Sequence, residues 1–143
     1  LDFTGRELPA AFAMIQLYTA LDDADAAFDR FDDLLAITES SETPFLPYEH
    51  ARIYAERGWL HAQLEQFDAA LADFETATSI DATYPKVYFY RGLVYDELDN
   101  ASAALDDLTT FLDLEADFFG YYEENLTPFI VRARKLIDDM GLD

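Results

Sequence analysis

The sequence of 143 residues contains no cysteine. Without thiols the chain forms no disulfide, offers no thiolate ligand to a metal and has no cysteine nucleophile. Glycine and proline are sparse, five of each, and no apolar run approaches the ~18 residues that a membrane-spanning helix requires. About half of the residues are apolar, including twelve Phe and nine Tyr. Length and composition therefore predict a single folded domain over residues 1–143.

Positive charge is also scarce. Nine basic residues stand against thirty acidic ones, which gives a formal net charge of -21. Such a surface repels phosphate backbones and anionic lipid, so we expect no nucleic-acid partner and no membrane insertion. Two explanations of the acidic excess stay open: helix faces that keep the protein soluble, or adaptation to a salty cytoplasm. No N-terminal signal is visible in this chain, and the sequence favours a cytoplasmic location.

Residues suited to catalysis or metal binding are few. His50 and His61 are the only histidines, and neither has an acidic partner at metal-ligand spacing. An aspartate cluster over residues 22–33 invites a calcium interpretation, but it lacks the glycine and the closing glutamate of an EF-hand loop. A solvated helix face explains the cluster better. No phosphate loop or nucleophile motif stands out, so we predict no enzyme, no metal and no cofactor.

An internal repeat of 34 residues is the clearest positive feature. The stretch YAERGWLHAQLEQFDAALADF (residues 54–74) aligns with YFYRGLVYDELDNASAALDDL (residues 88–108). The identities pair Tyr54 with Tyr88, Arg57 with Arg91, Gly58 with Gly92, Leu64 with Leu98, Ala70 with Ala104, Leu71 with Leu105, and Asp73 with Asp107. A period of this length, with a helix, a turn and a second helix, is typical of a solenoid of helical hairpins.

This pattern resembles the tetratricopeptide-repeat (TPR) family. The family's small residue in the first helix corresponds to Gly58 and Gly92, and its alanine in the second helix to Ala70 and Ala104. A third, earlier copy aligns at a shift of 43 residues and carries Ile15 at the glycine position. The resemblance implies an all-α fold, an α-α superhelix of about three hairpins, with units at about 9–38, 48–81 and 85–115.

Residues 127–141 follow a different pattern. Thr127 is a plausible N-cap, Pro128 suits the first helical position, and Gly141 suits the end of a helix. One apolar stripe runs along the segment: Phe129, Ala133, Leu136, Ile137 and Met140. Because a solenoid exposes the apolar side of its last repeat, we predict a capping helix over about 127–141.

The glycines suggest close helix packing. Glycine inside a helix costs about 1 kcal/mol relative to alanine. We expect that cost to be offset by a close approach of the second helix, with Ala70 opposite Gly58 and Ala104 opposite Gly92.

The spacing of sixteen residues between Arg57 and Asp73 recurs between Arg91 and Asp107. In a helical hairpin these side chains lie across from one another, which predicts an ion pair in each of the last two units. Separately solvated charges are the alternative. An exposed pair would contribute at most about 1 kcal/mol.

The resemblance implies that the first helices line a concave face that binds ligands. The matching residues are Phe12, Gln16, Arg52, Trp59, Lys86, Phe89, Tyr90 and Leu93. Large aromatics with isolated positive charge suit a peptide with apolar anchors and an acidic group or terminal carboxylate. One TPR subgroup binds chaperone carboxyl termini through Lys, Asn and Arg side chains, but only Lys86 fits that pattern here.

The sequence thus predicts a non-catalytic scaffold that binds a peptide or protein in its concave groove. Two structural alternatives stay open at the groove: its aromatics simply pack, or the C-terminal helix folds back into it. A different class of function is a structural module, either part of a longer solenoid or a homo-oligomer. For self-association the aromatic run FFGYY (residues 118–122) is the candidate contact.

Overall fold

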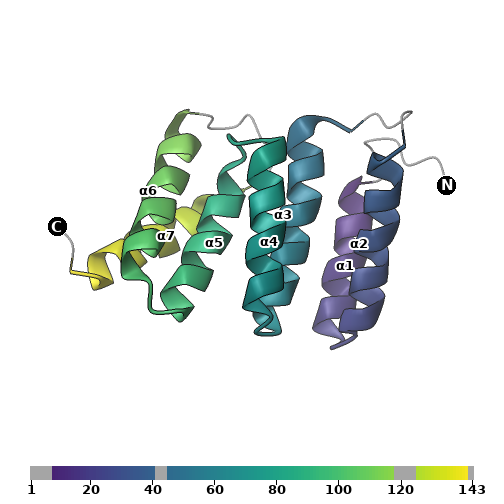
Figure 1. The fold of residues 1–143 in the computed structure, drawn as a ribbon, viewed down its shortest axis with the longest axis horizontal. Helices are drawn as coiled ribbons and strands as arrows, with labels where there is room; N and C mark the ends of the chain where they lie inside the picture. Colours follow the sequence, from purple (N-terminus) through teal and green to yellow (C-terminus); the bar gives the residue numbers. More distant parts are fainter. Residues whose placement is uncertain (1–7, 41–44, 118–124, 142–143) are drawn as a thin grey trace.

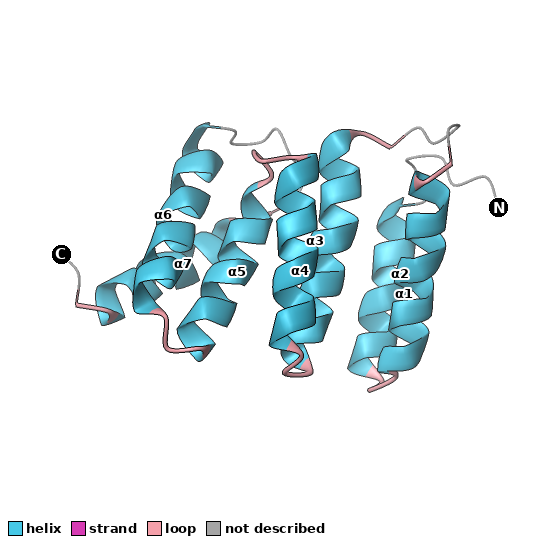
Figure 2. Cartoon of the chain, in the orientation of Figure 1, coloured by secondary structure: helices cyan, strands magenta, loops and turns pink. Residues whose placement is uncertain are grey.

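The computed structural model describes residues 8–40, 45–117 and 125–141. Within these ranges the chain forms seven helices and no strand: α1 (Leu8–Ala20), α2 (Ala24–Thr38), α3 (Pro47–Gln63), α4 (Phe67–Ile80), α5 (Pro85–Glu97), α6 (Ala101–Asp117) and α7 (Thr127–Asp139) (Figures 1 and 2). The run at 118–122 lies outside the described residues. None of the described helices has the length and apolar character needed to cross a membrane.

The first six helices form three hairpins that stand side by side in chain order (Figure 1). The closest contacts lie within each hairpin, and α3 also contacts α2 and α5, so each hairpin packs on the next. Two buried apolar clusters result, one around α1 and α2 and one extending from α3 to α7. This arrangement confirms the predicted α-α superhelix.

The turn inside each hairpin repeats the same backbone geometry. Asp22, Glu65 and Asp99 stand at equivalent repeat positions and have φ angles of 58°, 59° and 57°. The next residue in each turn donates its backbone N–H to a carbonyl five residues earlier, over 2.9 Å in all three cases. The first hairpin, whose sequence is the most divergent, therefore closes with the same turn as the other two.

The glycines allow close packing, with Ala70 near Gly58 and Ala104 near Gly92 as expected, and a side chain of the second helix lies closer still. A Cβ on Gly58 would lie 2.7 Å from Cε1 of Phe74 and 3.1 Å from the backbone oxygen of Ala70. The ring of Phe74, four residues beyond Ala70, fills the space that the missing side chain leaves. At Gly92 the corresponding distance is 3.0 Å, to Leu108.

The first hairpin has no such glycine. Its helices, with the buried side chain of Ile15 between them, make fewer close backbone contacts than those of the second hairpin. Where Ile15 replaces the glycine, the two helices of the hairpin thus pack less closely.

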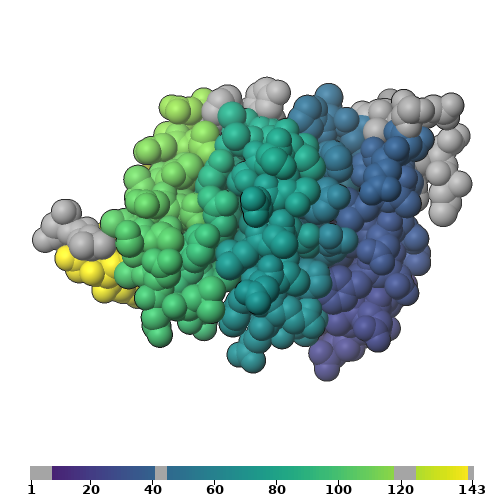
Figure 3. Space-filling model, viewed as in Figure 1, coloured from purple at the N-terminus to yellow at the C-terminus, as the bar shows by residue number. Residues whose placement is uncertain are grey.

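Helix α7 leaves the hairpin pattern and crosses behind α5 and α6 (Figure 1). On the face formed by α2, α4 and α6 it is visible only at one edge (Figure 3). Ala133 is fully buried, and the other residues of its apolar stripe pack against the large cluster. The N-cap is Leu126 rather than Thr127, and the Asn125 side chain accepts a hydrogen bond from the Thr127 N–H over 3.2 Å.

Candidate peptide-binding groove

A cleft of about 350 Å³ spans all three hairpins on the side of their first helices. Six of the eight groove residues predicted from sequence line it: Phe12, Gln16, Arg52, Trp59, Lys86 and Tyr90. Glu56 and Phe129 are also in its wall. The fold thus brings together side chains from α1, α3 and α5 that are far apart in the sequence, and α7 adds one of its own.

Two cations and one carboxylate give this cleft its charge. The guanidinium of Arg52 lies 4.1 Å from the ring centroid of Phe12, within the range of a cation-π contact. Lys86 Nζ donates to Glu56 Oε1 over 2.7 Å, and the Tyr90 hydroxyl donates to the same carboxylate over 3.0 Å. The formal charge of these groups is positive, in a chain that is strongly acidic elsewhere.

Trp59 divides the groove. Its ring stacks on Tyr90 with centroids 4.8 Å apart and planes tilted by 6°. Beyond it lies a second cleft of about 270 Å³, which contains Leu93 together with Glu65, Asp96 and Glu97. Trp59 and Gln63 line both clefts, and Arg132 also lines the second one. The groove thus changes from a positive section to a mainly acidic one across Trp59 and Gln63.

Helix α7 forms one wall of this groove. The Phe129 ring meets the Phe89 ring edge to face at 5.0 Å, and Lys86 Nζ lies 5.1 Å from the Phe129 centroid. Phe89 is 1% exposed and lines neither cleft, so it supports the groove from below. Tyr90, Lys86 and Leu93 are also buried, and they reach the clefts only by their edges. The fold-back of the C-terminal helix is therefore part of the architecture.

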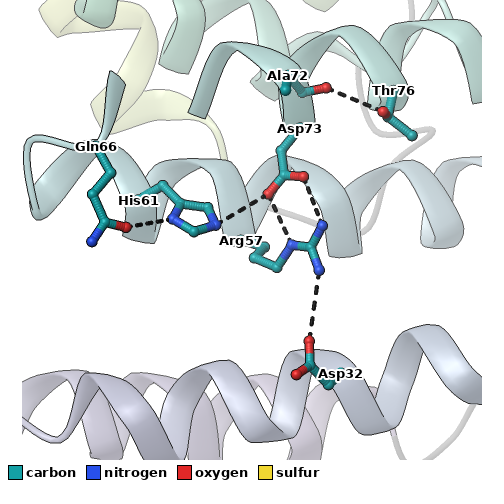
Figure 4. A network of polar contacts seen from close by, with 7 residues as sticks. All are labelled: Asp32, Arg57, His61, Gln66, Ala72, Asp73 and Thr76. Carbon is teal, nitrogen blue, oxygen red and sulfur yellow. Dashed lines mark hydrogen bonds and ion pairs between the residues drawn. The ribbon is translucent and has the colours of Figure 1, made fainter. Parts of the chain in front are cut away.

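Charged pairs join the two helices of the second and third hairpins, as the sequence spacing predicted. Arg57 donates to both oxygens of Asp73, over 2.9 and 2.8 Å (Figure 4). In the third hairpin, Arg91 donates to both oxygens of Asp107 over 2.8 Å. These hydrogen bonds raise the pKa of Arg57 and Arg91 above the usual arginine value, because they stabilise the charged form.

These pairs are partly buried. Both aspartate side chains are only 9% exposed. Bidentate geometry and partial burial place them above ordinary surface ion pairs in strength. They fix the rotation of α3 and α5, whose opposite sides line the groove.

Sequence reasoning missed two members of the network around Arg57. Asp32 Oδ1 of α2 lies 3.6 Å from Arg57 Nη1, and His61 Nε2 lies 3.8 Å from Asp73 Oδ2 (Figure 4). The His61 Nδ1 atom is also 2.7 Å from Gln66 Oε1. Asp32 belongs to the aspartate cluster that we interpreted as a solvated face, and its contact links the first two hairpins.

The described ranges contain no group of three or more His, Asp or Glu side chains placed to hold a metal ion.

The first hairpin has a different ion pair. Arg30, at the repeat position of Asp73, pairs with Asp33 on its own helix at 3.0 Å. The arginine and aspartate positions of the first hairpin thus changed together, and this hairpin lacks the bond between its helices.

The fold and the repeated hairpin define a helical-repeat protein of the α-α superhelix class. Residues 51–99 match a family model described as TPR repeat, which confirms the resemblance over that stretch. No curated protein matches the chain. TPR repeats are in general protein-interaction scaffolds and are typically not catalytic.

Proposed function

We propose that this chain is a non-catalytic scaffold that binds a peptide segment of a partner protein in the groove between α1, α3, α5 and α7. The observation that carries the proposal is the gathering of six predicted residues from three hairpins around one cleft. Such a cleft accepts one or two ligand side chains, and the open groove on either side accommodates the rest of a peptide.

The lining favours a ligand with an apolar anchor and an acidic group. The anchor would pack on the Trp59 ring, which stacks on Tyr90; the Tyr90 ring in turn contacts Phe129 edge to face. The acidic group would lie near Arg52 and Lys86, where the local charge is positive although the chain carries -21 overall. This local positive charge favours an acidic segment at the cleft, although the chain is acidic overall.

Selection from a random peptide display library tests this proposal. We expect the selected peptides to share an aromatic or aliphatic residue near a carboxylate. Trp59→Ala removes the stacked ring and should weaken binding about 30-fold or more, as truncation of a central aromatic anchor does. Gln16→Glu places a carboxylate at an exposed position of the cleft and should weaken binding by repulsion.

The matched control is Ser102→Glu, which adds the same charge at an exposed position on α6 that lines neither cleft. It should bind as the wild type does, and circular dichroism should show all variants folded. Peptides that bind all variants equally, or that share no acidic group, would contradict the proposal.

A further inference from the structure

The outward face of α1 is apolar and has no partner among the described residues. Leu17 is 56% exposed and Met14 is 43% exposed, and both lie opposite the buried side of the helix. Ala10 and Ala13 complete this face, which we call the α1 outer face (Ala10, Ala13, Met14 and Leu17). A helix that is apolar on all sides is normally covered on all sides. The α1 outer face thus lacks the polar side chains that usually cover the exposed side of a helix.

The repeat shows what such a face is built to contact. Leu17 stands at the position of Leu60 in the second hairpin and Val94 in the third, which are 5% and 1% exposed. Leu60 is buried in the cluster that it shares with α1 and α2, so the preceding hairpin covers it. Ala10 likewise corresponds to Ile53, which is fully buried in the same cluster. The α1 outer face therefore has the position and the apolar character of a helix-packing surface.

The lack of charge on the α1 outer face indicates which partner binds there. Helix α1 carries no charged residue over Leu8–Ala20, whereas each of the other described helices carries several. Met14 even replaces the arginine that, as Arg57, reaches the preceding hairpin's Asp32 in the second unit. Two chains of charge -21 repel one another wherever acidic faces meet. Among the described helices, α1 alone presents an uncharged surface on which two copies can approach without that repulsion.

We propose that the α1 outer face is a dimerisation surface, on which α1 of one copy packs against α1 of a second copy about a twofold axis. A twofold contact uses the same patch on both chains, so an uncharged patch is complementary to itself. Ala10 and Ala13 let the helices approach closely, and Met14 and Leu17 supply the apolar area. This contact lies at the end of the described array opposite α7, and it uses other residues than the segment 118–122 that the sequence suggested for self-association.

Sedimentation velocity of the full chain over a range of protein concentrations tests the proposal. We expect the mass to double as concentration rises, and the dimer to strengthen at higher salt because screening weakens the repulsion between the two chains. Leu17→Glu buries a charge in the contact and should raise the dissociation constant about 30-fold or more. Leu98→Glu is the matched control, since Leu98 is 44% exposed and lies far along the chain at the end of α5.

The dimer should persist in Leu98→Glu, and both variants should keep the helical content of the wild type. A wild-type chain that stays monomeric at every concentration and salt would overturn the proposal. A dimer that survives Leu17→Glu, or that both variants abolish, would overturn it as well. The dimerisation test does not depend on peptide binding in the groove, so the failure of one proposal does not contradict the other.

Discussion

Gly58 is the residue whose replacement tests the packing of the second hairpin most directly. An alanine there gains about 1 kcal/mol of helix propensity but places a Cβ 2.7 Å from the fully buried ring of Phe74. Overpacking of this kind costs about 1–3 kcal/mol, so Gly58→Ala should lower the free energy of unfolding by up to about 2 kcal/mol. Urea denaturation measures this change.

Gly92→Ala is the natural comparison, because it makes the same substitution at the equivalent repeat position. Its Cβ would lie 3.0 Å from Leu108, whose branched side chain adjusts more easily than a ring. The loss of stability should therefore be smaller at Gly92 than at Gly58. A Gly58→Ala chain more stable than the wild type would show that the ring is not held tightly.

At the same scale, the 34-residue period made Gly58 and the two arginine–aspartate pairs predictable. Identical residues at equivalent positions must meet equivalent neighbours, so sequence spacing alone located Asp73 opposite Arg57. The contact between Phe74 and Gly58 was harder to foresee, because it depends on how far one helix slides along the other. The approach of Asp32 to Arg57 depends on how two hairpins stack, and no repeat of sequence marks it.

Phe129 carries much of the attachment of α7. Its ring contacts Phe89 and Tyr90, and it is half-buried at the groove wall. Phe129→Ala should lower the free energy of unfolding by about 1–3 kcal/mol, less than a fully buried phenylalanine loses. Hydrogen exchange should become faster in α7 than in α3 or α4, because the helix detaches locally before the hairpins unfold.

Val131→Ala is the control on the same helix. Val131 is 64% exposed, so its truncation should change stability by less than about 0.5 kcal/mol and leave the exchange of α7 unaltered. If Phe129→Ala behaved like this control, α7 would be anchored mainly through Ala133 and the aliphatic side chains that follow it.

For whole elements, the sequence predicted α7 and its apolar stripe as a cap on the last repeat, but left open whether the helix also folds back into the groove. A stripe of this kind fits any apolar surface left open by the last hairpin. The position of α7 is set by Phe129, whose ring packs against aromatic rings and lies beside Lys86. The family resemblance located the groove residues. It did not predict the burial of Phe89 and Tyr90, which depends on where Phe129 packs.

Folding brings the many acidic residues of the whole molecule close together, and their mutual repulsion opposes folding. Thirty acidic residues and nine basic ones in one chain repel on average, and ion pairs between the described helices, such as Arg57 with Asp73, offset this locally. The repulsion acts over the Debye length, about 30 Å at 0.01 M salt and about 8 Å at 0.15 M. The free energy of unfolding should therefore rise with NaCl, which urea denaturation measures at protein concentrations where sedimentation finds a monomer.

Two substitutions at one exposed position separate screening from other effects of salt. Thr109→Lys reduces the net negative charge and Thr109→Glu increases it, at an exposed position in the middle of α6, away from the helix ends where the helix dipole acts. At low salt the lysine variant should be the more stable of the two, and the difference should shrink as salt rises. Equal stability at all salt concentrations would mean that the acidic faces are spaced too widely to repel. Complete unfolding at low salt would instead favour adaptation to a salty cytoplasm, because folding would then depend on constant screening.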